Sequence, residues 1–123
     1  WIRGIDHRVD PHYPGVRDLS FSNSAKLAGA GAGVGEAPVE VAELCASYTH
    51  EELLLCEALG LGDETRINPS GGALVSNPPM VAGLTRIGEA FRQIHDHGHH
   101  RTLGHASSGP CLQQNLVCVL EGE

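Results

Sequence analysis

The chain has 123 residues and a mass of 13.0 kDa, enough for one folded domain with one hydrophobic core. Its 41% hydrophobic and 19% charged residues are typical of globular proteins and argue against a disordered chain, and no apolar stretch is long enough to span a bilayer. Fifteen acidic against eight basic residues give a net charge of -7, which argues against a nucleic-acid surface.

The first third of the sequence predicts a strand, a loop and a helix. Residues 1–5 are typical of a short strand, and the following segment contains Pro11 and Pro14, which favour a polar loop. The Ala- and Gly-rich residues 24–34 predict a short helix that frays at 33–35 and packs closely through its small side chains. The glycines do not match the G-x-G-x-x-G pattern of dinucleotide-binding loops.

The middle of the sequence predicts a strand followed by a capped helix. Residues 39–45 alternate as a strand does. Thr49 and Glu52 have the spacing of a capping box, with Thr49 as N-cap, and the helix over 53–59 is expected to end at Gly60.

The last part predicts the longest helix and two strands. After a turn at 68–72 and a short apolar run at 73–75, the residues 77–79 (Asn-Pro-Pro) are expected to start the helix, with Asn77 as its cap. One face of this helix should carry Val81, Leu84, Ile87, Phe91 and Ile94. Residues 95–100 predict a polar connection, and 102–106 and 116–120 an antiparallel pair of strands. Together the elements indicate an α/β layered domain.

The cysteines and histidines do not indicate a metal site. Cys45, Cys56, Cys111 and Cys118 lack C-x-x-C spacing and favour reduced thiols, which is consistent with a cytoplasmic protein. The run from His95 to His100 is rich in imidazole, but it lacks regular ligand spacing, so we expect a solvated loop and no structural metal.

Three turns carry the candidate functional residues: around 45–48, around 68–79 and around 107–111. Tyr48 and His50 precede a helix start, where backbone N–H groups favour anions, although capping alone explains His50. Cys111 follows Gly109-Pro110 in a turn whose small residues allow close approach of a ligand. The spacing alone does not force the three turns together, and it implies no reaction.

The same three turns resemble a known family. VAELCASYTHEEL (41–53), EALGL (57–61), NPSGGAL (68–74) and SGPCLQQNLV (108–117) occur in the order found in the C-terminal domain of the thiolase superfamily. Within it, they are similar to the branch of sterol-carrier-protein-X and actinobacterial lipid-transfer-like enzymes. The resemblance implies a C-terminal thiolase half-domain, with layered helices on a mixed β-sheet, over residues 1–123. It also implies that the N-terminal half lies outside this chain, which is then the tail of something longer or a shortened gene product.

What the family does sets the functional expectation. Thiolases join or cleave the carbon–carbon bond of 3-oxoacyl-CoA, with a nucleophilic cysteine in the N-terminal half and a histidine and a second cysteine in the C-terminal half. Here Cys45 occupies a position where the branch has a histidine, and Pro78 occupies the position of the family's catalytic histidine. Ser108 aligns with the family's second cysteine, and Cys111 lies a few residues after that position.

These departures leave two main readings. The first is an acyltransferase of the acetyl-CoA acetyltransferase type, or a carbon–carbon lyase of lipid metabolism, with Tyr48, Cys111 and Cys45 as catalytic candidates and Asn77, Ser108 and Gly109 at the substrate. It needs no cofactor besides the coenzyme A thioester that is its substrate. Its partners are the N-terminal half or a second copy of the chain, and a zinc-ribbon/OB-fold protein as in related aldolases. The second reading is a non-catalytic module that binds acyl-CoA or lipid, as in lipid transfer, or that only assembles with partners.

Overall fold

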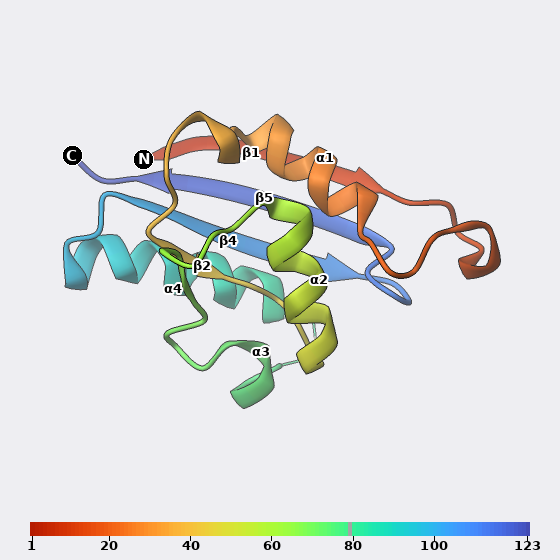
Figure 1. Cartoon of the computed structure of the whole chain (residues 1–123). Coiled ribbons are helices and arrows are strands. Elements are labelled where there is room, and N and C mark those ends of the chain that lie inside the picture. The colour runs from red at the N-terminus through yellow and green to blue at the C-terminus, as the bar shows by residue number, and fades with distance from the viewer. Residues whose placement is uncertain (79) are drawn as a thin grey trace.

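The computed structural model describes residues 1–78 and 80–123, which form one mixed sheet with helices on both faces (Figure 1). The strands are β1 (Ile2–Val9), β2 (Val41–Glu43), β3 (Arg66–Ile67), β4 (Arg101–Ser108) and β5 (Gln114–Glu121). The helices are α1 (Asn23–Ala32), α2 (Thr49–Leu59), α3 (Gly72–Val75) and α4 (Ala82–His97), with 3-10 turns η1 (Pro14–Val16) and η2 (Val34–Glu36).

The sheet order β1-β5-β4-β2-β3 combines antiparallel and parallel pairing. β5 pairs antiparallel with both β1 and β4, which confirms the predicted antiparallel pair at the end of the chain. β4, β2 and β3 are parallel to one another. Because β1 and β4 both oppose β5, the carboxyl ends of β1, β4 and β2 lie at the same edge of the sheet. The opposite edge holds both ends of the chain.

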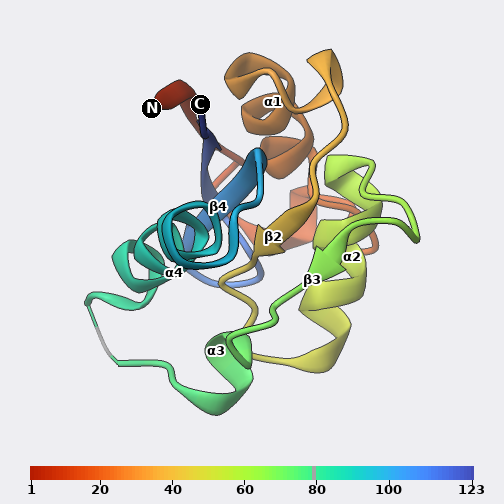
Figure 2. The same cartoon turned by 90° about the vertical axis from the view of Figure 1, so that its left-hand side faces the viewer.

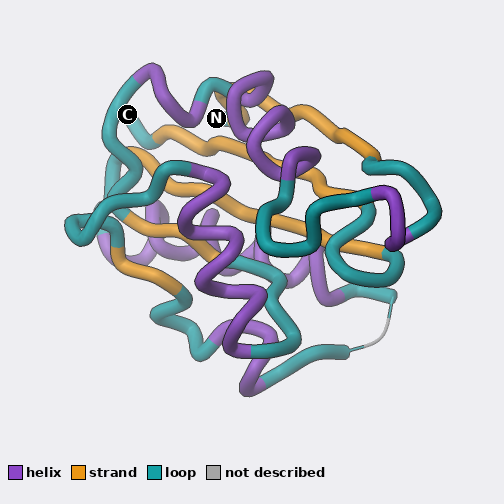
Figure 3. Tube along the Cα trace, turned by 45° about the vertical axis from the view of Figure 1, so that its right-hand side comes forward, coloured by secondary structure: helices purple, strands orange, loops and turns teal. Residues whose placement is uncertain are grey.

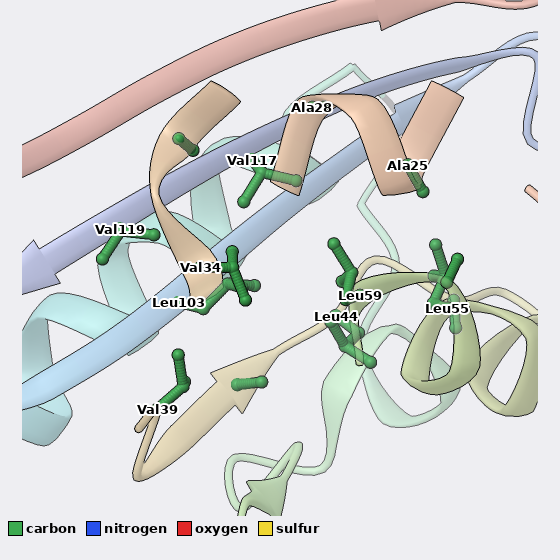
Figure 4. Close-up of a cluster of buried hydrophobic side chains, with 14 of the residues drawn as sticks. Ala25, Ala28, Val34, Val39, Leu44, Leu55, Leu59, Leu103, Val117 and Val119 are labelled. Atoms are coloured by element: carbon green, nitrogen blue, oxygen red, sulfur yellow. The ribbon is translucent and has the colours of Figure 1, made fainter. Parts of the chain in front are cut away.

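The helices form two layers with the sheet between them (Figure 2). α1 packs on β1 and β5, α2 contacts α1 on the same side, and α4 packs on β4 and β2 from the other side. The main core lies under α1 and α2 and includes Leu55 and Leu59 of α2 and Leu103 and Val117 of the sheet (Figure 4). A smaller cluster around Ala90, Cys118 and Leu120 lies under α4. The predicted α/β layered architecture is confirmed.

The close packing predicted for the Gly-rich helix is confirmed at two positions. A Cβ atom built on Gly4 of β1 would collide with the backbone of Ala32 in α1, and one on Gly31 would collide with the Asp6 carboxylate. Gly4 is therefore required for α1 to lie this close to β1, while a larger residue at position 31 would force the Asp6 side chain to move. The helix ends at Gly33, which has a left-handed φ of 84°.

The start of α2 lies one residue before the predicted position. Tyr48 is the N-cap, and Glu51 accepts from the backbone N–H of Ser47 at 2.8 Å and of Tyr48 at 3.3 Å. The predicted pair of Thr49 and Glu52 was wrong, because the Glu52 carboxylate instead accepts from the Asn68 side chain. The predicted end at Gly60 is confirmed by its left-handed φ of 65°.

α4 differs from its prediction at both ends. The helix begins at Ala82 with Val81 as N-cap, so Asn77 does not cap it, and the expected first-turn Pro79 lies outside the described residues. The helix continues to His97 and ends at Gly98, so the first half of the histidine run is helical and not a loop. Since Gly98 supplies the left-handed residue that ends the helix, the boundary follows that glycine.

The predicted apolar stripe of α4 is only half covered. Ile87 and Ile94 pack against the cluster under the helix, while Leu84 and Phe91 are exposed. The fully covered face holds Arg86, Ala90 and Gln93 instead. Among the described residues, no helix combines the length and apolar character needed to cross a bilayer.

Candidate functional site

The structure brings the three candidate turns to one edge of the sheet. The segment after β2, the turn after β4 and the loop before α4 all lie at the carboxyl ends of the parallel strands, which is where α/β sheets bind ligands. Two hydrogen bonds join them: Ser107 Oγ donates to the Cys45 carbonyl at 2.9 Å, and Asn77 Nδ2 donates to Ser47 Oγ at 2.9 Å. The sequence alone did not indicate this meeting.

Cys45 is fixed in the interior between β2 and β4. Its side chain is buried, and its backbone N–H donates to Nδ1 of His105 at 3.3 Å. With its carbonyl bound to Ser107, both backbone groups of Cys45 are engaged. The residue therefore ties two of the three turns together, and its thiol does not face solvent.

His105 and Asn115 form the buried polar centre of this edge. A backbone N–H donates to His105 Nδ1, so the imidazole proton is on Nε2, which donates to Asn115 Oδ1 at 2.9 Å. Burial lowers the pKa of His105 to about 4, because the low-dielectric interior disfavours the imidazolium, and the bond to Asn115 offsets only part of this. Asn115 Nδ2 donates in turn to Ser24 Oγ at 2.7 Å and to the Leu112 carbonyl at 2.8 Å.

The turn at 68–72 is held by a buried ion pair. Glu43 of β2 accepts from Ser70 Oγ at 2.6 Å and from the Ser70 N–H at 3.0 Å. Arg86 of α4 lies 3.3 Å from the same carboxylate and donates to Ser70 Oγ at 3.0 Å. Both charged side chains are buried, so each requires the other as a partner. This pair connects β2, α4 and the turn before α3.

A cavity of about 500 Å³ opens where two of the three turns, the one after β2 and the one between β4 and β5, face the loop between β1 and α1. It is lined by the N-cap Tyr48 and by His50, Glu51 and Leu54 of α2, by Cys111 and Leu112, and by Asp10, Pro11, Val16, Arg17, Asp18, Leu19, Phe21, Ser22 and Asn23. Figures 1 and 3 show the β1–α1 loop beside the β4–β5 turn at this end of the molecule. The volume is within the range of small-molecule sites.

Two of the predicted catalytic residues, Tyr48 and Cys111, line this cavity. Tyr48 is 63% exposed, and its ring stacks on that of His50 with centroids 5.7 Å apart. Cys111 is exposed and has a φ of 53° in the β4–β5 turn. Ser108 and Gly109 precede it in the same turn but do not line the cavity, and neither does Asn77.

The β4–β5 turn is held from two sides. Arg17 of the β1–α1 loop donates from Nη1 to the Cys111 carbonyl at 3.2 Å and from Nη2 to the Pro110 carbonyl at 3.0 Å. Asn115 binds the Leu112 carbonyl from the interior. The backbone between them is left-handed at Gly109, Cys111 and Leu112, with φ of 75°, 53° and 53°.

Sequence reasoning did not single out Arg17, His105, Asn115 or the Glu43–Arg86 pair. His105 in the middle of β4 and Asn115 at the start of β5 are fully buried, and buried polar side chains of this kind take part in a hydrogen-bond network. Arg17 is an ordinary loop arginine in the sequence, and its role depends on a turn more than 90 residues away.

The histidine run is not gathered into a metal site in the structure. His95 pairs with Asp96, and His99 Nδ1 lies 2.8 Å from Oε2 of Glu40, the residue before β2. Within residues 1–78 and 80–123 no group of three or more His, Cys, Asp or Glu side chains is arranged to hold a metal ion.

Comparison with solved structures identifies the fold. No protein-family model matches the sequence, and no curated protein matches it either. The human mitochondrial 3-ketoacyl-CoA thiolase superposes with a TM-score of 0.70 at 16% identity, over 99% of this chain and 30% of that one. A monomeric SCP2-thiolase like protein type 1 from Mycobacterium smegmatis superposes with a TM-score of 0.67 at 22% identity, over 97% of this chain and 28% of that one.

The chain thus spans less than a third of the length of either thiolase-fold protein, and nearly all of it is matched. A five-stranded mixed sheet with α1 and α2 on one face and α4 on the other agrees with the half-domain that the sequence motifs implied. The chain has the thiolase fold, arranged as the C-terminal half-domain.

Proposed function

We propose that this chain is the C-terminal part of a thiolase-fold protein that acts on an acyl-CoA thioester, as an acyltransferase or a carbon–carbon lyase. The observation that carries the proposal is the cavity of about 500 Å³ at the carboxyl ends of the parallel strands, which is lined by both Tyr48 and Cys111 although they are 63 positions apart in the sequence. The two solved structures compared above are named as a thiolase and a thiolase-like protein.

Three residues are our candidates for proton transfer or covalent chemistry. Tyr48 ranks first, because its phenol lies at the cavity and is open to a ligand. Cys111 ranks second as an exposed thiol at the same cavity. Cys45 ranks third, since its thiol is buried and requires a local rearrangement to reach a ligand. We assign Asn77, Ser108 and Gly109 to contacts with substrate beyond the cavity itself.

The charge of the cavity supports an orientation for the substrate. Asp10, Asp18 and Glu51 line it against one arginine, Arg17, whose guanidinium is already engaged by two carbonyls. Such a lining repels the phosphates of coenzyme A and leaves the apolar wall to the acyl group. We therefore propose that the acyl end enters the cavity while the nucleotide stays outside it.

Because this cavity repels the phosphates of coenzyme A, the phosphate contacts have to come from a partner. We propose that the nucleophilic cysteine and the phosphate contacts come from an N-terminal thiolase half or a second copy of the chain, in a cytoplasmic assembly. Leu84 and Phe91 of α4 are exposed. Ile5 and Val9 of β1 are exposed as well, and they point to the α4 side of the sheet because the alternate residues Gly4 and Asp6 face α1. These apolar side chains offer a surface for the partner. A lyase activity would add a zinc-ribbon/OB-fold partner.

An affinity-label experiment on the purified 123-residue chain tests the acyl-CoA site. Chloroacetyl-CoA presents an electrophilic acyl group: the sulfur of a cysteine thiolate bonds to its methylene carbon, chloride leaves, and the thiol proton passes to solvent. We expect Cys111 to be alkylated by chloroacetyl-CoA at least about tenfold faster than by chloroacetamide, because bound substrate raises the effective concentration of the electrophile. Fragmentation of the tryptic peptides by tandem mass spectrometry locates the label, because Cys111 and Cys118 share the peptide 102–123 and Cys45 and Cys56 share the peptide 27–66.

Two controls belong to this experiment. Excess coenzyme A should protect Cys111, and half-buried Cys56, which does not line the cavity, should show no preference between the reagents. Equal rates at Cys111 with the two reagents, or no protection, would contradict the proposed acyl-CoA site.

A non-catalytic module that binds acyl-CoA or lipid is the second candidate. Two observations favour it: Pro78 at the position of the family's catalytic histidine has no group to transfer a proton, and His105 is enclosed and bound at both nitrogens. Protection by coenzyme A together with unchanged turnover in a Tyr48→Phe, Cys111→Ser double variant of the assembled protein would favour this candidate.

A further inference from the structure

Arg17 of the β1–α1 loop holds the turn carrying Cys111 through two side-chain hydrogen bonds, while among the described residues His12 of the same loop contacts only the Gln113 side chain at the far end of that turn. Its two terminal nitrogens donate to consecutive carbonyls, of Pro110 and Cys111, across more than 90 residues of sequence. Both the loop and the turn line the cavity. The guanidinium therefore joins two walls of the site.

The turn that Arg17 holds has a strained backbone conformation. Cys111 and Leu112 have φ of 53°, a conformation that side chains other than glycine rarely adopt and that persists only where the surroundings enforce it. Asn115 supplies one restraint, from the buried interior to the Leu112 carbonyl at 2.8 Å. The Asp10 N–H supplies a second, to the Gln113 carbonyl at 2.8 Å. Arg17 supplies the restraint on Pro110 and Cys111 themselves. Without Arg17, the Pro110–Cys111 segment is free to relax toward an unstrained turn.

We propose that Arg17 is a positioning residue that holds Cys111 toward the acyl group, a role that rests on the acyl-CoA site proposed above. Arginine suits this role because its planar fork donates to two acceptors at once, whereas the ammonium of lysine is a single point charge on a flexible stem. The Arg17 Nε is buried without a hydrogen-bond partner in the described part of the chain, so the two carbonyls are what keeps the guanidinium in place.

The readout is the ratio of the two alkylation rates of Cys111, with chloroacetyl-CoA over chloroacetamide. Arg17→Lys and Arg17→Ala should lower this ratio about tenfold or more toward unity, because a small misplacement of a reacting group is costly in a directed reaction and immaterial in an undirected one. In Arg17→Ala, guanidinium ion at tens of millimolar should restore part of the ratio, and sodium chloride at the same concentration should not.

Two internal comparisons separate positioning from general loss of structure. Arg8→Ala removes an arginine that pairs with Asp6 on β1 and does not line the cavity, so it should leave the ratio within about twofold of the parent chain. Buried Cys118 reports on opening of the fold: a variant that merely loosens the protein raises the chloroacetamide rate at Cys118 as well as at Cys111.

The outcomes distinguish this inference from the proposed function. A parent chain with no preference for chloroacetyl-CoA would overturn the acyl-CoA site, and the role of Arg17 with it. A parent chain that shows the preference, together with Arg17→Lys and Arg17→Ala variants that keep it within about twofold, would overturn the positioning role alone.

Discussion

The imidazole of His105 has no contact with solvent, and this makes it a measurable pH-sensitive element of stability. Its pKa is lowered from 6.5 to about 4 in the folded state by burial. Between these values the unfolded chain binds a proton that the folded chain does not. His105 therefore makes its whole contribution to the free energy of unfolding above pH 6.5, and that contribution is lost as the pH drops toward 4. At about 1.4 kcal/mol per pKa unit, the loss amounts to about 3 kcal/mol.

We therefore expect urea unfolding to show stability rising with pH between 4.5 and 6.5 in the parent chain, and this rise to be largely removed in His105→Gln. His97→Gln, on the exposed end of α4, is the matched control and should keep the rise. The pKa of Glu40 is lowered, chiefly by its hydrogen bond with His99, so its contribution to the free energy of unfolding is lost only at lower pH. Glu40 therefore does not affect the slope between pH 4.5 and 6.5. An unchanged slope in His105→Gln would show that other groups cause the dependence.

Tyr48 offers the corresponding prediction for activity. In the chain assembled with its N-terminal half, Tyr48→Phe should lower turnover about 10²–10⁴-fold while leaving substrate affinity nearly unchanged, because the phenol proton is lost and the ring remains. Tyr13→Phe, in the exposed β1–α1 loop and outside the cavity lining, is the control and should leave turnover unchanged. Steady-state kinetics on an acyl-CoA substrate measures the turnover and the substrate affinity of both variants. Equal turnover of the parent and Tyr48→Phe would show that Tyr48 is only a packing residue.

At this scale the sequence predicted some residues and not others for a physical reason. Tyr48 and Cys111 lie beside clear local signals, a helix start and a small-residue turn, so local patterns were enough to name them as candidates. The residues that hold the candidate turns in place act over long sequence separations: His105 on Cys45 across 60 positions, and Arg17 on Cys111 across 94. Hydrogen bonds of that range depend on strand order, which local patterns do not contain.

At the scale of elements, the contact between α4 and β2 depends on the buried pair of Arg86 and Glu43. Arg86→Leu leaves the Glu43 carboxylate buried beside Ser70 alone, and we expect a loss of about 3–5 kcal/mol in the free energy of unfolding. The Arg86→Leu, Glu43→Leu double variant should be less destabilised than the sum of the two single changes, because it removes both charges.

Arg92→Leu on the same helix is the control for that experiment. Arg92 forms exposed pairs with Glu89 and Asp96, so its loss should change stability by less than about 1 kcal/mol. Chemical denaturation followed by far-UV circular dichroism measures the parent chain and the four variants. Similar losses in Arg86→Leu and Arg92→Leu would show that the buried pair adds nothing specific to the contact between α4 and β2.

The elements themselves were predicted better than their boundaries. Ala- and Leu-rich helices, alternating strands and glycine stops gave the right order of α1, β2, α2, α4, β4 and β5. The start of α4 was wrong because Asn77 engages Ser47 across the site, a tertiary contact that competes with capping. The buried face of α4 was wrong in part because a charged residue, Arg86, is neutralised by Glu43 and can therefore occupy a core position.

For the whole molecule, we expect the purified chain not to be a working thiolase. With a net charge of -7 and eight basic residues, it has little to hold the phosphates of coenzyme A, so acetyl-CoA should bind weakly and acetoacetyl-CoA should not be thiolysed. Covalent capture by chloroacetyl-CoA remains compatible with this, because even brief occupancy accumulates as label. Isothermal titration and a thiolysis assay check the expectation, and micromolar binding with turnover would overturn it.

The chain should also self-associate through the exposed apolar side chains of α4. Phe91→Lys should shift the sedimentation profile toward monomer, because it places a charge in the contact. Leu53→Lys, on exposed α2 at the opposite side of the sheet, is the control and should leave the profile unchanged. A parent chain that is monomeric at high micromolar concentration would contradict this prediction.

The two ends of the chain are held side by side, since the Trp1 amino group donates to the Glu121 carbonyl at 2.6 Å and the Glu121 N–H to the Trp1 carbonyl at 2.9 Å. β1 runs from this point to the loop at the cavity over eight residues, about 27 Å at 3.4 Å per residue. A bead, a surface anchor or a fluorophore attached at either end therefore sits at the pole opposite the cavity. Linking the ends and reopening the chain at the exposed residues 62–64 would give a circular permutant whose handles for immobilisation point in a new direction while the site keeps its walls.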